Sequence, residues 1–133
     1  LAGKPWPEGA AALRQRGLVD AGTEAAVQRI WLFGQLIANT DMHDGNLAFR
    51  PGLSLAPVYD MLPMAYAPMR GVELPERDFV PRLPLPAQRE AWQCAAQAAE
   101  HFWALASGDG RISAAFRAIC ASNAEKVRQA LLA

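Results

Sequence analysis

The organising stretch of this 133-residue chain is NTDMHDGNLAF at residues 39–49, followed by LAPVYD at residues 55–60. Three polar residues in it stand out by their order and spacing: Asp41, Asn46 five residues later, and Asp60 fourteen residues after that. Apolar residues flank them, which is typical of loops that carry chemistry and leave a packed scaffold. The pattern predicts a functional loop that is supported by packed elements on both sides.

The order of these side chains is the one that phosphoryl transfer requires. In kinase-type sites one carboxylate takes the proton of the attacking hydroxyl, while an amide oxygen and a second carboxylate hold Mg²⁺ on the phosphates. The spacing from Asp41 to Asn46 equals that of the catalytic loop H-R-D-L-x-x-x-N, and Asp60 takes the place of the aspartate in D-F-G. The residues therefore predict the metal-binding half of a kinase.

Other interpretations of the same stretch have to be weighed. Asp and Asn both favour turns, so the pair of Asp41 and Asn46 is a weak signal by itself. A calcium-binding loop needs oxygen ligands at its third and fifth positions and glutamate at its twelfth, and those positions hold His43, Gly45 and Gly52. A calcium loop is thus excluded. His43 is predicted either as a group that takes part in the chemistry or as a histidine that fixes the loop by hydrogen bonds.

The residues before this stretch predict a helix that leads directly into Asp41. Thr23 is the expected N-cap of this helix, which should cover residues 24–38. A glycine inside a helix costs about 1 kcal/mol relative to alanine, so we expect a neighbour to pack closely on Gly34. One buried stripe follows the three-and-four spacing of a helix: Val27, Ile30, Trp31, Gly34, Ile37 and Ala38. The helix is expected to support the catalytic loop from below.

Shorter elements surround this helix. Residues 1–9 contain Pro and Gly and are expected to lack regular structure, and a short helix should follow over 10–16. Two alternating segments around Pro51 and Gly52 predict a small β-hairpin over 47–56, which would bring Asp60 back towards Asn46. Residues 61–86 hold six prolines and should form a long loop.

Two further helices are expected after the loop. The first should cover residues 87–106 and pack through Trp92 and Trp103, and the second should run from residue 112 or 113 to 132. Ser122 and Asn123 are a candidate break or second N-cap within the second helix. The fold class is therefore mainly α, with a small β-hairpin at the catalytic and metal site. The length predicts a single domain over 1–133.

Composition limits the function classes. Thirteen basic residues balance thirteen acidic ones, and no basic stripe suggests direct binding to nucleic acid. Cys94 and Cys120 form no C-x-x-C motif, which favours a reducing compartment over a disulfide framework or a structural zinc site. The sequence shows neither an apolar run of membrane-spanning length nor a signal peptide. A cytoplasmic location without membrane association is the expectation.

Two segments, residues 36–46 and 55–63, resemble the C-terminal domain of HipA-family serine/threonine kinases, the toxins of bacterial toxin–antitoxin pairs. The resemblance implies the helical C-terminal lobe of a protein-kinase-like fold. It also implies ATP as co-substrate, Mg²⁺ as cofactor, a protein hydroxyl as acceptor and an antitoxin as possible partner. By position, Asp41 would be the catalytic base with His43 beside it. Asn46 and Asp60 would bind Mg²⁺ and, through it, the nucleotide.

The sequence departs from a complete kinase in one respect. A kinase also needs a sheet-borne lysine, its glutamate partner and a loop that covers the nucleotide, and no β-rich segment precedes Asp41 here. We therefore expect a fragment that lacks the N-terminal kinase lobe and has little activity alone. The loop 61–86 holds no Ser or Thr, which excludes switching by Ser/Thr phosphorylation there. Two alternatives stay open: a lipid or small-molecule kinase of the D-x-H-x-x-N type, and a non-catalytic scaffold that binds a protein.

Overall fold

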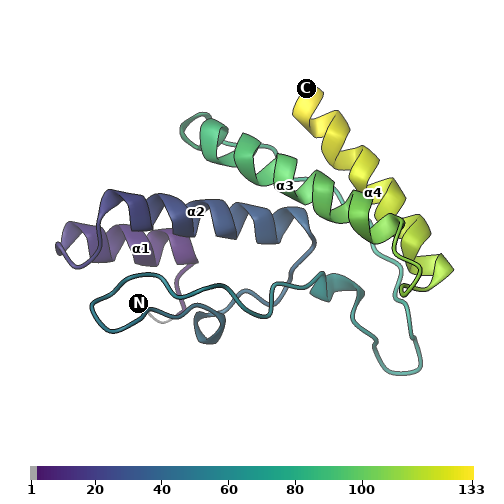
Figure 1. Ribbon diagram of the computed structural model, residues 1–133, viewed down its shortest axis with the longest axis horizontal. Coiled ribbons are helices and arrows are strands. Elements are labelled where there is room, and N and C mark those ends of the chain that lie inside the picture. The colour runs from purple at the N-terminus through teal and green to yellow at the C-terminus, as the bar shows by residue number, and fades with distance from the viewer. Residues whose placement is uncertain (1–2) are drawn as a thin grey trace.

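The computed structural model describes residues 3–133 and is mainly helical, as the sequence predicts. Four α-helices account for most of the regular structure, and α1 packs on α2, α2 on α3, and α3 on α4 (Figure 1). A long irregular segment leaves the end of α2, passes below α1 and α2 in this view, and returns to α3. The elements are α1 (Trp6–Gln15), α2 (Ala21–Leu36), α3 (Arg89–Ser107) and α4 (Ala114–Leu132), with short 3₁₀ turns η1 (Asp44–Asn46), η2 (Met64–Tyr66) and η3 (Pro86–Gln88).

The first two helices begin earlier than predicted. Helix α1 starts at Trp6 rather than at residue 10, because prolines at the first positions of a helix lose no hydrogen bond. The expectation of no regular structure over 1–9 is thus wrong for residues 6–9, and residues 1–2 lie outside the described part. Helix α2 is capped by Asp20, whose Oδ1 accepts a hydrogen bond from the Thr23 backbone N–H at 2.8 Å. The prediction of Thr23 as the N-cap is therefore wrong.

Helix α4 begins at Ala114, one or two residues after the predicted start, and it has no break. Ser113 caps it, and its side chain accepts a hydrogen bond from the Phe116 backbone N–H. The helix continues through Ser122 and Asn123 without interruption. An asparagine interrupts a helix when its side chain bonds to the nearby backbone, and here the Asn123 amide bonds to the Tyr66 hydroxyl instead.

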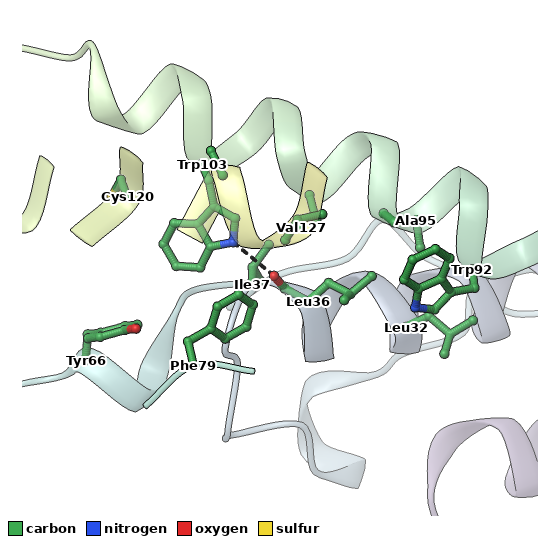
Figure 2. Packing of buried hydrophobic residues seen from close by; sticks show 13 residues of the cluster. Leu32, Leu36, Ile37, Tyr66, Phe79, Trp92, Ala95, Trp103, Cys120 and Val127 are labelled. Atoms are coloured by element: carbon green, nitrogen blue, oxygen red, sulfur yellow. Dashed lines mark hydrogen bonds between the residues drawn. The ribbon is translucent and has the colours of Figure 1, made fainter. Parts of the chain in front are cut away.

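The main core lies where α2, α3 and α4 meet the irregular segment, around the fully buried Trp103. Figure 2 shows its indole nitrogen directed at the end of α2, where Nε1 donates a hydrogen bond to the Leu36 carbonyl at 2.9 Å. The last carbonyls of a helix have no partner within the helix, so this bond satisfies one of them. Aromatic rings pack around Trp103, namely Tyr66, Phe79, Phe102 and Phe116. The core thus fixes the end of the helix that leads into the candidate site.

The end of α2 has a defined geometry. The Asn39 N–H donates to the Gly34 carbonyl at 2.9 Å, and the Ala38 N–H donates to the Gln35 carbonyl at 3.3 Å. This is the pattern of a Schellman motif, in which the residue after the cap takes a left-handed conformation. That residue is Ala38, with a φ of 61°, at a position where glycine is usual. The chain therefore turns sharply as it enters the loop.

The predicted hairpin is reduced to a single pair. Phe49 and Leu55 form an isolated antiparallel bridge, and Arg50 N–H donates to the Ser54 carbonyl at 2.7 Å. The chain folds back as expected, but the two sides form no extended strands. Within residues 3–133, every helix is too short or too polar to cross a lipid bilayer.

Candidate functional site

Two buried asparagines fix the backbone of Asp41. The Asn39 side-chain oxygen accepts a hydrogen bond from the Asp41 N–H at 3.0 Å, and the Asn46 Nδ2 donates to the Asp41 carbonyl at 2.8 Å. Asn39 and Asn46 are only 6% and 7% exposed, whereas Asp41 is exposed. The two amides thus hold the peptide groups on either side of Asp41 and leave its carboxylate in solvent.

The Asn46 side chain has one atom available for a ligand. Its nitrogen is used by the bond to Asp41, and no hydrogen bond to its oxygen is present among residues 3–133. An amide oxygen is a ligand that Mg²⁺ accepts, and in the described range this oxygen is not among the buried side-chain atoms that lack a partner, so an ion can reach it. The donor chemistry of Asn46 therefore fits the metal-binding role that the sequence predicts.

His43 fixes the loop by a hydrogen bond. Its Nδ1 accepts from the Gly45 backbone N–H at 3.0 Å, so the proton of the neutral ring is on Nε2. That Nε2 atom lies 3.6 Å from the Asp41 Oδ1. A side chain at Gly45 would come within 2.9 Å of the His43 ring, which explains the glycine there. The arrangement supports the structural interpretation of His43 and also places its N–H beside the predicted base.

The segment that carries Asp60 is attached to this loop through both neighbours of Asp60. The Tyr59 hydroxyl donates a short hydrogen bond to the Gly45 carbonyl, and the Met61 sulfur accepts one from the Asn39 Nδ2 at 3.4 Å. Asp60 itself is exposed, with a left-handed backbone (φ 52°). The structure therefore brings the segment of Asp60 to the loop, while the Asp60 carboxylate forms no hydrogen bond to another residue in the described range.

Gly34 provides the surface on which both segments rest. A Cβ atom at Gly34 would overlap the Met42 sulfur and lie 3.3 Å from the Met61 sulfur. Met42 follows Asp41 directly and Met61 follows Asp60, so one position of α2 supports both acidic residues. The expectation of close packing at Gly34 is confirmed. No sequence pattern marks Met42, Met61 and Asn39 as positioning residues, and the mid-helix glycine is the one signal of this contact in the sequence.

The N-terminal segment also contacts the loop. The Trp6 indole N–H donates to the His43 carbonyl at 3.2 Å, and the Gly3 N–H donates to the Asp44 carboxylate at 2.9 Å. A hollow of about 470 Å³ lies between this segment and the loop, with Lys4 and His43 on its wall. The first residues of the described chain thus form one side of the space next to the candidate site.

The acidic residues by themselves do not form a metal cage. Within residues 3–133 there is no cluster of three or more His, Cys, Asp or Glu side chains that could hold a metal ion. Mg²⁺ does not require one, because it is usually bound by one or two carboxylates together with water and substrate phosphates. Asn46 and Asp60 carry an amide oxygen and a carboxylate, which are the donor types that such a sparse site would use.

Comparison with known proteins gives two matches to this chain. The family model described as the HipA-like C-terminal domain matches residues 7–131. The toxin YjjJ of Escherichia coli is 42% identical over 127 residues, which cover 93% of this chain and 29% of that protein. The chain therefore spans less than a third of the length of this relative. No solved structure matches the chain.

Proposed function

Because this chain belongs to the family of HipA-like C-terminal domains, we propose that it is the catalytic lobe of a kinase that transfers the γ-phosphate of ATP to a protein serine or threonine. The resemblance of the helical fold to a kinase C-terminal lobe is part of this proposal. So are a cytoplasmic location and an antitoxin partner, the latter because the matched relative is itself a toxin.

The observation that carries the proposal is the double use of Asn46. Its buried amide nitrogen holds the carbonyl of Asp41, and its oxygen is left for a cation. One side chain thus ties the position of a candidate base to the position of a candidate metal ligand. In the described range this oxygen has no hydrogen-bond partner and is not shut off from solvent, so a cation can reach it.

The proposed roles follow from these contacts. Asp41 takes the proton of the acceptor hydroxyl, since its carboxylate is exposed while its backbone is held on both sides. Asn46 and Asp60 would hold Mg²⁺, which would supply positive charge to neutralise the nucleotide phosphates. His43 keeps Gly45 in place, and its Nε2 lies 3.6 Å from the Asp41 Oδ1, beside the proposed base.

The remaining parts of a kinase site would come from the rest of the complete protein. A lysine on a sheet and a loop over the nucleotide are needed to hold the phosphates. Within residues 3–133 no sheet is present to carry such a lysine. We therefore expect these 133 residues to show little or no activity in isolation.

The test is the substitution Asp41→Asn in the complete protein, assayed with labelled ATP and cell lysate. Loss of a positioned general base costs typically 10²–10⁴-fold in rate, so transfer should fall by about that factor. Asp44→Asn is the matched control, because Asp44 lies in the same loop and its amide retains an oxygen to accept the Gly3 N–H. Wild-type turnover by Asp41→Asn would refute the assignment.

The same assay separates the alternatives. Label that enters small molecules or lipids, and not protein, would show a kinase of the D-x-H-x-x-N type with a different acceptor. Absence of Mg²⁺-dependent nucleotide binding by the complete protein would show a non-catalytic scaffold.

A further inference from the structure

A second hollow lies between α4 and the irregular segment, and it shares no lining residue with the hollow beside His43. Its volume is about 280 Å³. The wall from the irregular segment includes Tyr66 and Arg77, and the wall from α4 includes Ser122, Asn123 and Lys126. Most of these side chains carry hydrogen-bond donors. The hollow is therefore suited to a ligand that accepts hydrogen bonds.

The two cations in this hollow, Arg77 and Lys126, form no ion pair with any residue of the described range. Arg77 Nε donates to the Ala65 carbonyl at 2.7 Å, and Lys126 Nζ donates to the Phe79 carbonyl at 3.1 Å. These neutral carbonyls hold the side chains in place without cancelling their charge. Among residues 3–133, no carboxylate lies within ion-pair distance of either group, although Glu76 also lines the hollow. The hollow thus keeps a positive charge.

The floor of the hollow contains a buried polar pair with unused protons. Asn123 is 2% exposed and Tyr66 is 6% exposed, and the Asn123 Nδ2 donates to the Tyr66 hydroxyl at 3.0 Å. In this orientation the hydroxyl proton and the second amide proton have no acceptor among the described residues. If the amide is flipped, both amide protons are left instead. Either way, two donor protons remain in a nearly fully buried pair.

We propose that this hollow binds a phosphate group, either as inorganic phosphate or as a phosphate monoester. A phosphate offers several acceptor oxygens and a charge near −2, which matches Arg77, Lys126 and the free protons of the Tyr66–Asn123 pair. Arginine suits this ligand because its planar guanidinium binds phosphate oxygens in pairs. In Arg77, Nη1 donates to the Glu76 carbonyl and Nη2 to the Met69 sulfur, and each of these nitrogens keeps one further N–H for a phosphate oxygen. The bound group would connect the irregular segment to α4. This inference does not depend on the catalytic role of Asp41.

The test is a titration of the ¹⁵N-labelled chain with inorganic phosphate and, separately, with O-phospho-L-serine, at constant ionic strength set with sodium chloride. We expect saturable NMR shifts of the Asn123 side-chain amide and of Ser122, Arg77 and Lys126. Saturation by both probes supports a general phosphate site. Saturation by only one probe supports the site and identifies free phosphate or the monoester as its ligand. Shifts by neither probe would overturn the proposal.

Variants locate the binding. Arg77→Gln should weaken binding about tenfold or more, since it removes a charge-assisted contact. Tyr66→Phe should weaken it less, because it removes one donor and keeps the ring. The matched control is Arg70→Gln, which changes an exposed arginine of the same loop that does not line the hollow. Unchanged affinity in both Arg77→Gln and Tyr66→Phe, or an equal loss in Arg70→Gln, would contradict the proposed location.

Discussion

The core around Trp103 and the loop around Asp41 are held by different means. Large apolar side chains and aromatic rings surround Trp103, so many small van der Waals contacts together stabilise this core. The loop is held by a few single contacts: the amides of Asn39 and Asn46, the ring of His43, and methionine sulfurs against Gly34. Changes in the core should therefore act mainly on stability, and changes around the loop mainly on activity. The following substitutions test this contrast.

Trp103→Ala should have the largest effect on stability. It removes a fully buried ring and leaves the Leu36 carbonyl without its indole donor. The expected loss is about 3–5 kcal/mol in the free energy of unfolding, measured by urea denaturation. Trp103→Phe, which keeps an aromatic ring but not the N–H, should cost less. Equal stability of Trp103→Ala and the wild type would show that this core is not the main source of stability.

Gly34→Ala should separate the two regions. The added methyl group would overlap the Met42 sulfur and press on Met61, so both acidic segments must shift. Overpacking costs about 1–3 kcal/mol, partly offset by the better helix propensity of alanine. The rate of phosphoryl transfer by the complete protein should therefore fall by a larger factor than the loss in free energy of unfolding alone would explain. The double substitution Gly34→Ala with Met42→Ala makes room again and should recover part of the activity. Full activity of Gly34→Ala would contradict the role of this contact.

Asn39→Asp should have a smaller effect. The aspartate keeps the oxygen that accepts the Asp41 N–H but loses the donor to the Met61 sulfur. Asn39→Ala loses both and should cost about 1–2 kcal/mol, since a buried hydrogen-bond partner is removed. Comparing thermal unfolding and activity of the two variants shows which contact matters. If both variants behave like the wild type, the amide of Asn39 does not position the loop.

Asp109→Asn should have the smallest effect, confined to the pH dependence of stability. Hydrogen bonds from Arg111 lower the pKa of the Asp109 carboxyl from 3.8 to about 2. Because the folded pKa is the lower one, this contribution is complete above the unfolded pKa and is lost as pH falls from about 4 to about 2. The variant should therefore show a flatter stability curve in that window. Identical curves of unfolding free energy against pH for Asp109→Asn and the wild type would contradict the lowered pKa of Asp109.

The same contrast explains what the sequence could predict. The helices of the core follow from apolar spacing, and close packing at Gly34 was recognisable because a mid-helix glycine is a local signal. The start of α2 was mispredicted because Asp20 and Thr23 are both good caps. Asn123 was mispredicted as a break because its partner, Tyr66, is 57 residues away. Local patterns thus predict elements, but they do not reveal which distant residue a polar side chain will contact.

The candidate site shows this limit most clearly. The positions of Asp41, Asn46 and Asp60 in the sequence predict a shared chemistry, and the structure places the neighbours of Asp60 against the loop. Met42 and Met61 are 19 residues apart, and no spacing rule indicates that both rest on Gly34. The contacts that position a site depend on the folded backbone. Sequence alone therefore predicts the reactive residues better than the residues that hold them in place.

The left-handed Ala38 at the end of α2 has a consequence for how this domain can change over time. An alanine in this conformation costs roughly 1 kcal/mol that a glycine would not, so Ala38→Gly offers an accessible gain in stability. A glycine at position 38, however, would allow more backbone conformations after the helix. Asn39 would then form its hydrogen bonds to Asp41 and Met61 in only some of these conformations. Ala38 thus lowers the stability of the fold slightly but restricts the direction in which the chain continues after α2.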